Sequence, residues 1–200
     1  MIDNKIIGIT GGIGSGKSTV LKILHNEYNA FVIEADKVGH IVISPGENAY
    51  KKIINEFGNE ILLSDNTIDR KKLGAVVFND KHKLNKLNSI IHPEVKAYII
   101  NYIDDIRKHY NKPLIFIEAA LLIEDKYDEI CDLLWYIYTD KEIRYKRVSE
   151  SRNMTREKFN SIVNNQLSDE IYKERCDVII DNSLDLENTK TQIYQALNLK

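Results

Sequence analysis

The sequence has no excess of basic residues, no long apolar segment and few cysteines. Its 28 lysines and arginines stand against 30 aspartates and glutamates, giving a formal net charge of −2. Extended contact with nucleic acid needs a bulk positive charge that this composition lacks. No run approaches the length of about 18 apolar residues that spans a membrane, and no charged-then-apolar leader opens the chain. We therefore expect a cytoplasmic protein without a nucleic-acid or membrane partner.

The two cysteines, Cys131 and Cys176, lie far apart and lack C-x-x-C spacing. This arrangement indicates neither a disulfide framework nor a zinc site, so we expect small buried thiols in a reducing compartment. A chain of 200 residues buries roughly 70% of its unfolded surface, enough for one core with an appended lobe. The sequence does not fix the oligomeric state, and a monomer is the simplest expectation.

The strongest pattern present is the glycine-rich stretch GGIGSGKS at residues 11–18. It fits G-x-x-x-x-G-K-[ST], follows an apolar run at 6–9 and precedes another at 20–24. Strand, glycine loop and helix in this order are typical of a phosphate-binding P-loop, whose backbone N–H groups and helix dipole face phosphate oxygens. The expected nucleotide-binding residues are Gly12, Ile13, Gly14, Ser15, Gly16, Lys17, Ser18 and Thr19.

Two side chains of this stretch predict specific chemistry. Lys17 can reach the β- and γ-phosphates of ATP, and the Ser18 hydroxyl can bind Mg²⁺. The alternative is a glycine-rich turn before a helix whose lysine is solvated. Four glycines cost conformational entropy that an ordinary turn would not need, so the P-loop is favoured.

Five apolar runs of strand length alternate with helical patterns, at residues 6–9, 30–33, 114–117, 133–138 and 178–180. This alternation predicts an α/β fold with a parallel, doubly wound five-stranded sheet. Residues 37–111 instead hold helical patterns at 49–57, 71–78, 83–91 and 93–110. We expect an inserted helical substrate lobe there, with Pro93 in the first turn of its long helix.

Two carboxylates follow predicted strands. Asp36 is a candidate general base or metal-side carboxylate, because ligands bind at the carboxyl ends of strands in such sheets. An aspartate that caps a helix starting at Lys37 would look the same. Glu118 closes the run at 114–117, so in a parallel sheet it would lie at the edge of the P-loop and contact Mg²⁺ through water.

Basic side chains supply the remaining candidates. Arg144, Arg147 and Arg152 follow the fourth strand run, where a P-loop protein carries a phosphate-clamping lid. The alternative is solvated charge on a helix surface. In the helical region, Arg70 either meets a phosphate or begins a helix behind an acidic cap, and His92 is best interpreted as a capping or packing histidine.

In this order the motifs closely resemble those of dephospho-CoA kinases, and no guanine-reading N-K-x-D is present. The resemblance covers about residues 6–182. The matching segments are 8–18, Glu34-Ala35-Asp36, Gly39-His40, Pro45-Gly46, Ile68-Asp69-Arg70, Leu73, Phe78, Leu87-Asn88, His92-Pro93, 121–124, Arg147, Gln166 and 176–182.

The resemblance implies transfer of the ATP γ-phosphate to the ribose 3′-hydroxyl of dephospho-CoA, with Mg²⁺. It implies a three-layer P-loop core at 1–36, 112–140 and 166–200, a CoA-binding lobe at 37–111 and a lid at 141–165. Asp36 would orient or deprotonate the 3′-hydroxyl, with Lys17 and Arg147 stabilising charge. His40, Arg70 and His92 would contact the acceptor, and Arg152 would join Arg147 in the lid.

The chain departs from the family pattern at four places. Glu34 replaces the first aspartate of D-A-D, Ala120 replaces a proline, Arg144 replaces a glutamine, and Arg152 lies one residue beyond the usual lid arginine. Another small-molecule or nucleoside-monophosphate kinase is the alternative enzyme. A nucleotide-binding module without transferase activity is the alternative from another class.

Overall fold

The computed structural model describes residues 4–119 and 121–198. The elements in chain order are β1 (Ile6–Thr10), α1 (Lys17–Tyr28), β2 (Phe31–Glu34), α2 (Ala35–Val42), α3 (Asn48–Phe57), α4 (Arg70–Phe78), α5 (Lys81–His109), β3 (Ile115–Glu118), β4 (Leu133–Tyr138), α6 (Lys141–Arg152), α7 (Arg156–Asn164), α8 (Asp169–Arg175), β5 (Val178–Asp181) and α9 (Leu186–Leu197). Two short 3₁₀ helices lie at Asn59–Ile61 and Tyr127–Ile130. Contacts divide the chain into two compact units, Met1–Ile33 with Tyr110–Lys200, and Glu34–His109.

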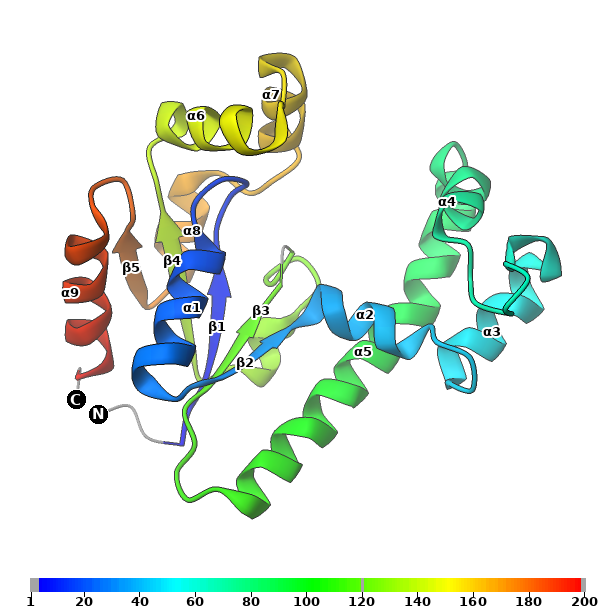
Figure 1. Cartoon of the computed structure of the whole chain (residues 1–200), viewed down its shortest axis with the longest axis horizontal. Coiled ribbons are helices and arrows are strands. Elements are labelled where there is room, and N and C mark those ends of the chain that lie inside the picture. Colours follow the sequence, from blue (N-terminus) through cyan, green and yellow to red (C-terminus); the bar gives the residue numbers. More distant parts are fainter. Residues whose placement is uncertain (1–3, 120, 199–200) are drawn as a thin grey trace. The chain divides into compact units, whose positions relative to one another are not determined.

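The first unit is built on a parallel sheet with strand order β2-β3-β1-β4-β5, which confirms the predicted fold class. The Phe31 N–H donates to the Leu114 carbonyl at 2.9 Å, so β2 and β3 also start side by side. Helices α1 and α9 cover one face of the sheet and α8 lies on the other (Figure 1). The order places the carboxyl ends of β1, β3 and β4 together, where the loop after β1 lies.

Apolar strands hold this unit together. Ile7, Ile9, Phe116 and Trp135 are each 0% exposed and pack with α1 and α9 in one core. Phe116 and Trp135 meet edge to face, with 5.3 Å between ring centroids. Continuous apolar runs are the pattern of strands covered on both faces. Helix α1 buries one stripe of side chains against this core, and this packing fixes the position of its first turn relative to the sheet.

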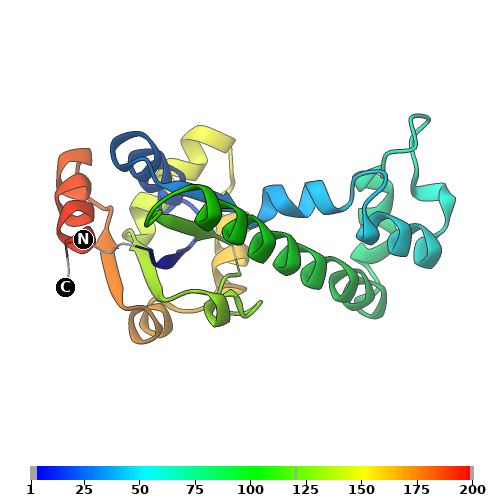
Figure 2. The same ribbon diagram turned by 90° about the horizontal axis from the view of Figure 1, so that it is seen from below.

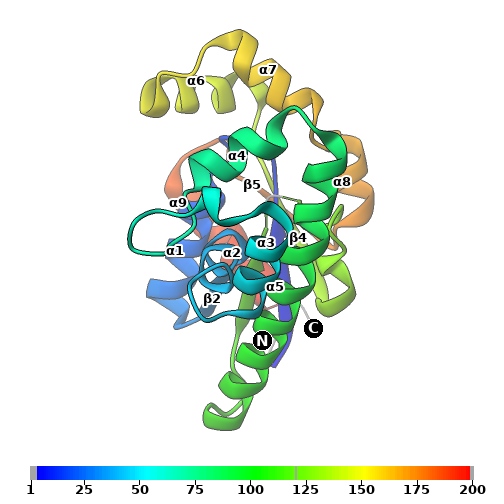
Figure 3. The ribbon, with the colours of Figure 1, turned by 90° about the vertical axis from the view of Figure 1, so that its right-hand side faces the viewer.

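The second unit is helical, with α2, α3 and α4 packed along α5 (Figures 2 and 3). The prediction of two helices separated before Pro93 is wrong, because α5 continues through this residue. A proline inside a helix costs about 3 kcal/mol. The buried stripe runs across it, with Leu87 and Ile90 before and Val95 and Ile99 after, and this packing offsets the lost hydrogen bond.

Within the described part of the chain, none of the helices has both the length and the hydrophobicity needed to cross a membrane.

Candidate active site

The glycine loop joins the end of β1 to the start of α1, as the motif predicts. Gly16 is the N-cap of α1 with φ 88°, a left-handed conformation that a residue with a Cβ rarely adopts. A Cβ there would also collide with the Asn182 amide. The first turn of α1 contains no acidic residue, so its positive dipole end is left for an external anion.

Lys17 lies across the loop. Its ammonium group donates to the Gly11 carbonyl at 2.9 Å and stands 3.7 Å from a carboxylate oxygen of Glu118, the last residue of β3. The two side chains are 16% and 14% exposed. The predicted proximity of Glu118 to the P-loop is therefore confirmed, through Lys17. Ser18, the next residue of α1, is exposed.

The inner side of the loop is fixed by a buried network that the sequence analysis did not identify as functional. The Ser15 carbonyl accepts hydrogen bonds from the Asn182 amide at 2.8 Å and from the Thr139 hydroxyl at 2.9 Å. The Thr189 hydroxyl donates to the Asn182 side-chain oxygen at 2.9 Å. All four residues are at most 5% exposed. Residues from the ends of β4 and β5 thus set the shape of the loop.

Arg147 belongs to the same network. Its guanidinium donates to the Asn182 carbonyl at 2.8 Å and more weakly to the Thr139 hydroxyl at 3.4 Å, and it lies beside Gly16. Asp140 is the N-cap of α6 and accepts hydrogen bonds from the N–H groups of Glu142 and Ile143. Arg152, at the other end of α6, is exposed, and its side chain has no hydrogen bond or ion pair with any residue that the structure describes.

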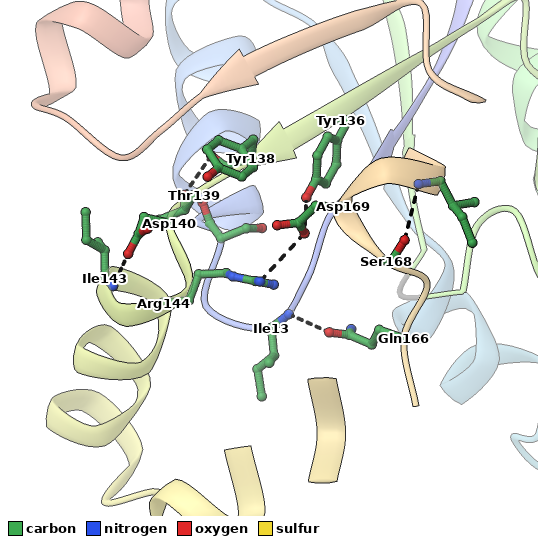
Figure 4. Close-up of polar contacts among 12 residues, drawn as sticks. Ile13, Tyr136, Tyr138, Thr139, Asp140, Ile143, Arg144, Gln166, Ser168 and Asp169 are labelled. Carbon is green, nitrogen blue, oxygen red and sulfur yellow. Dashed lines mark hydrogen bonds and ion pairs between the residues drawn. The ribbon is translucent and has the colours of Figure 1, made fainter. Parts of the chain in front are cut away.

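Arg144 is not a solvated surface residue, so that alternative is wrong for it. The residue is 5% exposed, and its guanidinium stands 3.7 Å from the Asp169 carboxylate, which also accepts a hydrogen bond from the Tyr136 hydroxyl at 2.7 Å. Burial and this hydrogen bond raise the pKa of Tyr136. Nearby, the Gln166 side-chain oxygen accepts from the Ile13 N–H at 3.1 Å, as Figure 4 shows.

Asp36 and His40 belong to the second unit, on α2. This helix begins at Ala35, so Asp36 lies in its first turn and is not the cap of a helix starting at Lys37. Its carboxylate is exposed and has no hydrogen bond or ion pair with the described residues. Glu34, the N-cap residue, instead pairs with the Lys37 ammonium at 2.6 Å. His40 lies in the last turn of α2 and is exposed.

Arg70 and His92 also lie in the second unit. Arg70 is the first residue of α4, behind Asp69, whose carboxylate accepts from the N–H groups of Lys71 and Lys72. The predicted acidic cap is confirmed, and the exposed Arg70 side chain has no ion pair among the described residues. His92 is half-buried inside α5, so it does not cap a helix. Ala120 lies outside the described residues.

The described residues contain no group of three or more histidine, cysteine, aspartate or glutamate side chains that could hold a metal ion. A metal at this site would depend on a hydroxyl, one carboxylate and the ligand's own oxygens. Mg²⁺ is the ion bound in that way, because it keeps several waters and takes one or two protein ligands beside substrate phosphates.

Comparison with known proteins places the chain in a family. The family model described as dephospho-CoA kinase matches residues 5–188. The dephospho-CoA kinase of Carboxydothermus hydrogenoformans is 39% identical over 192 residues, covering 96% of this chain and 92% of that protein.

Solved structures agree with this match. The protein TT1252 from Thermus thermophilus superposes with a TM-score of 0.81 at 27% identity, covering 98% of this chain and 97% of its own. A dephospho-CoA kinase from Campylobacter jejuni superposes with a TM-score of 0.72 at 27% identity, covering 96% and 94%. The glycine loop, the five-stranded parallel sheet and these matches along nearly the whole sequence lead to one conclusion: the chain belongs to the dephospho-CoA kinase family.

Proposed function

We propose that this chain transfers the γ-phosphoryl group of ATP to the ribose 3′-hydroxyl of dephospho-CoA, giving CoA and ADP. The observation that carries this proposal is the fixed glycine loop with Lys17 across it, in a chain that belongs to this family over nearly its full length. Phosphoryl transfer consists mostly of positioning and charge stabilisation, which a preformed loop supplies.

The donor half of the site is the loop and the start of α1. The N–H groups around Gly14 to Thr19 bind the phosphates, and Lys17 exchanges its contact with the Gly11 carbonyl for the β- and γ-phosphate oxygens. Ser18 would hold Mg²⁺, with Glu118 contacting it through water. Bound there, Mg²⁺ would neutralise charge on the phosphate oxygens. The exposed Ser18 and the Glu118 carboxylate beside Lys17 suit this ion.

The acceptor half is the helical unit, with Asp36 as its reacting side chain. The 3′-oxygen forms a bond to the γ-phosphorus as the bond from that phosphorus to the β,γ-bridging oxygen breaks, and ADP leaves. Asp36 orients the hydroxyl and accepts its proton. Its exposed carboxylate is available for this, since it has no partner among the described residues. His40, Arg70 and His92 hold the rest of the acceptor, Arg70 as a cation for phosphate.

Residues 141–165 act as the lid. Arg147 enters from α6 beside Gly16, where its charge faces the transferring group. Arg152 is free to join it when the lid closes. Closure excludes water, which suppresses hydrolysis of ATP.

ADP release from ATP and Mg²⁺ should be measured with a panel of acceptors, comprising dephospho-CoA, AMP and dTMP. The proposal expects turnover with dephospho-CoA and background release with the two nucleotides. Transfer to AMP or dTMP and none to dephospho-CoA would identify a nucleoside-monophosphate kinase. ADP release that does not rise with any acceptor would indicate a nucleotide-binding module. Either of these results overturns the proposal.

A further inference from the structure

The guanidinium of Arg144 is buried between the glycine loop and the start of α8. A Cβ on Gly12 would collide with one terminal nitrogen of this guanidinium, and a Cβ on Gly14 would lie 2.7 Å from the Arg144 carbonyl. The opposite terminal nitrogen is 3.7 Å from the Asp169 carboxylate. One side chain of α6 therefore touches the loop after β1 and the first residue of α8 at once.

Burying Arg144 in this way contributes little to the stability of the fold. Arg144 is 5% exposed, and its Nε has no hydrogen-bond partner among the described residues. The ion pair with Asp169 is longer than a hydrogen bond. Desolvation of a buried pair often cancels its Coulomb energy, and an apolar residue of similar volume is then equally stable or more so. Stability alone therefore does not account for an arginine here.

The geometry of the Arg144 guanidinium instead suits a role in positioning the glycine loop. The planar guanidinium keeps its two ends at a fixed separation, so contact with Asp169 at one end fixes the other end against Gly12. The Tyr136 hydroxyl, 2.7 Å from the same carboxylate, fixes Asp169 in turn. Gln166 restrains the neighbouring residue of the loop through the Ile13 N–H, and Figure 4 shows these contacts around one end of the loop.

We propose that Arg144 is a positioning residue for phosphoryl transfer: it holds the glycine loop in its phosphate-binding shape by fixing Gly12 against the Asp169 carboxylate of α8. This inference goes beyond the proposed function and rests on it for the reaction. Arg144 does not touch the phosphates in this account. It acts through the loop, whose N–H groups must meet the phosphate oxygens accurately, because a misplacement of about 1 Å costs up to 100-fold in rate.

The test compares Arg144→Met, Arg144→Lys and the control Arg175→Met. Arg175 is the exposed last residue of α8, outside the lid and the glycine loop, and its guanidinium lies 4.0 Å from the Asp128 carboxylate. For Arg144→Met we expect the Kd of ATP to rise about tenfold and kcat per folded enzyme to fall about tenfold, with the KM of dephospho-CoA unchanged. Arg144→Lys should recover part of the loss. Arg175→Met should match the parent protein.

A second comparison tests the contact with the loop directly. Gly12→Ala should weaken ATP binding because the new methyl group displaces the guanidinium, and adding Arg144→Gln should restore part of the binding by removing the obstacle. Equal ATP affinity and kcat for Arg144→Met and Arg175→Met would overturn the proposal, as would additive losses in the Gly12 and Arg144 double variant. ATP affinity is measured by calorimetry without an acceptor, so a failure of dephospho-CoA as substrate would be recognised separately.

Discussion

Replacing Asn182 by aspartate changes one atom of the network behind the glycine loop and reverses its hydrogen bonding. The Asn182 amide donates to the Ser15 carbonyl at 2.8 Å, and its oxygen accepts from Thr189 at 2.9 Å. An ionised carboxylate keeps the second bond and places an acceptor against the Ser15 carbonyl. The residue is 5% exposed, so water is not available to screen this contact.

The expected loss of unfolding free energy depends on the hydrogen bonds that remain after each substitution. After Asn182→Ala, the Ser15 carbonyl keeps its bond from Thr139 and the Thr189 hydroxyl keeps the Asp185 carbonyl at 3.2 Å. The alanine variant should therefore lose about 1–2 kcal/mol of unfolding free energy. Asn182→Asp adds a buried, unpaired acceptor and should lose about 3 kcal/mol. In a chain of this size that lowers Tm by roughly 6–12 °C.

These losses of unfolding free energy can be measured by urea unfolding of both variants between pH 5 and pH 8. Burial and the Ser15 carbonyl favour the neutral acid, so the pKa of the new carboxyl in the folded state lies above its unfolded value of about 3.9. A raised folded pKa means that the folded state binds more protons, so the aspartate penalty shrinks as pH falls and is largest above the folded pKa. A penalty equal to that of alanine, or one that grows toward pH 5, would refute the reasoning.

Three further predictions concern reacting groups. Lys17→Ala should reduce turnover to background in the ADP-release assay, because it removes the charge at the β- and γ-phosphates. Asp36→Asn should lower kcat at least 100-fold while the Kd of ATP changes less than threefold; equal losses in both would favour a metal-side or structural role. Burial, with smaller contributions from nearby aspartates, raises the pKa of Cys131 and of Cys176 to about 12. At pH 8 both thiols should therefore resist iodoacetamide in the folded protein and react in urea, and rapid alkylation of the native protein, detected by mass spectrometry, would contradict this.

Local patterns predicted the sheet and the glycine loop between β1 and α1 well. The fourth strand was expected at 133–138 and β4 spans Leu133–Tyr138, while α1 follows the glycine loop directly, as the motif predicts. An apolar run and a glycine loop before a helix are signals within a few residues of one another. Such local patterns predict structure reliably because residues that are close in sequence also lie close together in the folded chain.

The long helix α5 was mispredicted because propensity and packing oppose each other at Pro93. The missing N–H and the ring favour a helix start, whereas the apolar spacing from Leu87 to Val95 does not by itself decide between one helix and two. Helix α5 packs against α2, α3 and α4, and two of these helices, α2 and α3, lie well before it along the chain. Tertiary packing therefore decided the outcome.

The network around the loop depends on residues that are distant in sequence. Asn182 is 167 positions from Ser15, and Gln166 is 153 positions from Ile13. The family resemblance includes both residues, yet gives neither a role. Arg144 was expected among the arginines of a phosphate-clamping lid, with solvated charge on a helix surface as the alternative. Only the packing of α6 on Gly12 shows that its side chain is buried.

The proposed transfer of the ATP γ-phosphoryl group to the ribose 3′-hydroxyl of dephospho-CoA is tested most directly by identifying the phosphorylated product. Incubation with ATP, Mg²⁺ and dephospho-CoA should be followed by ³¹P NMR and mass spectrometry. The account predicts one CoA formed for each ADP, with the new phosphate resonance assigned to the ribose 3′-position. ADP formed without CoA, or a phosphate attached elsewhere on the acceptor, would contradict it.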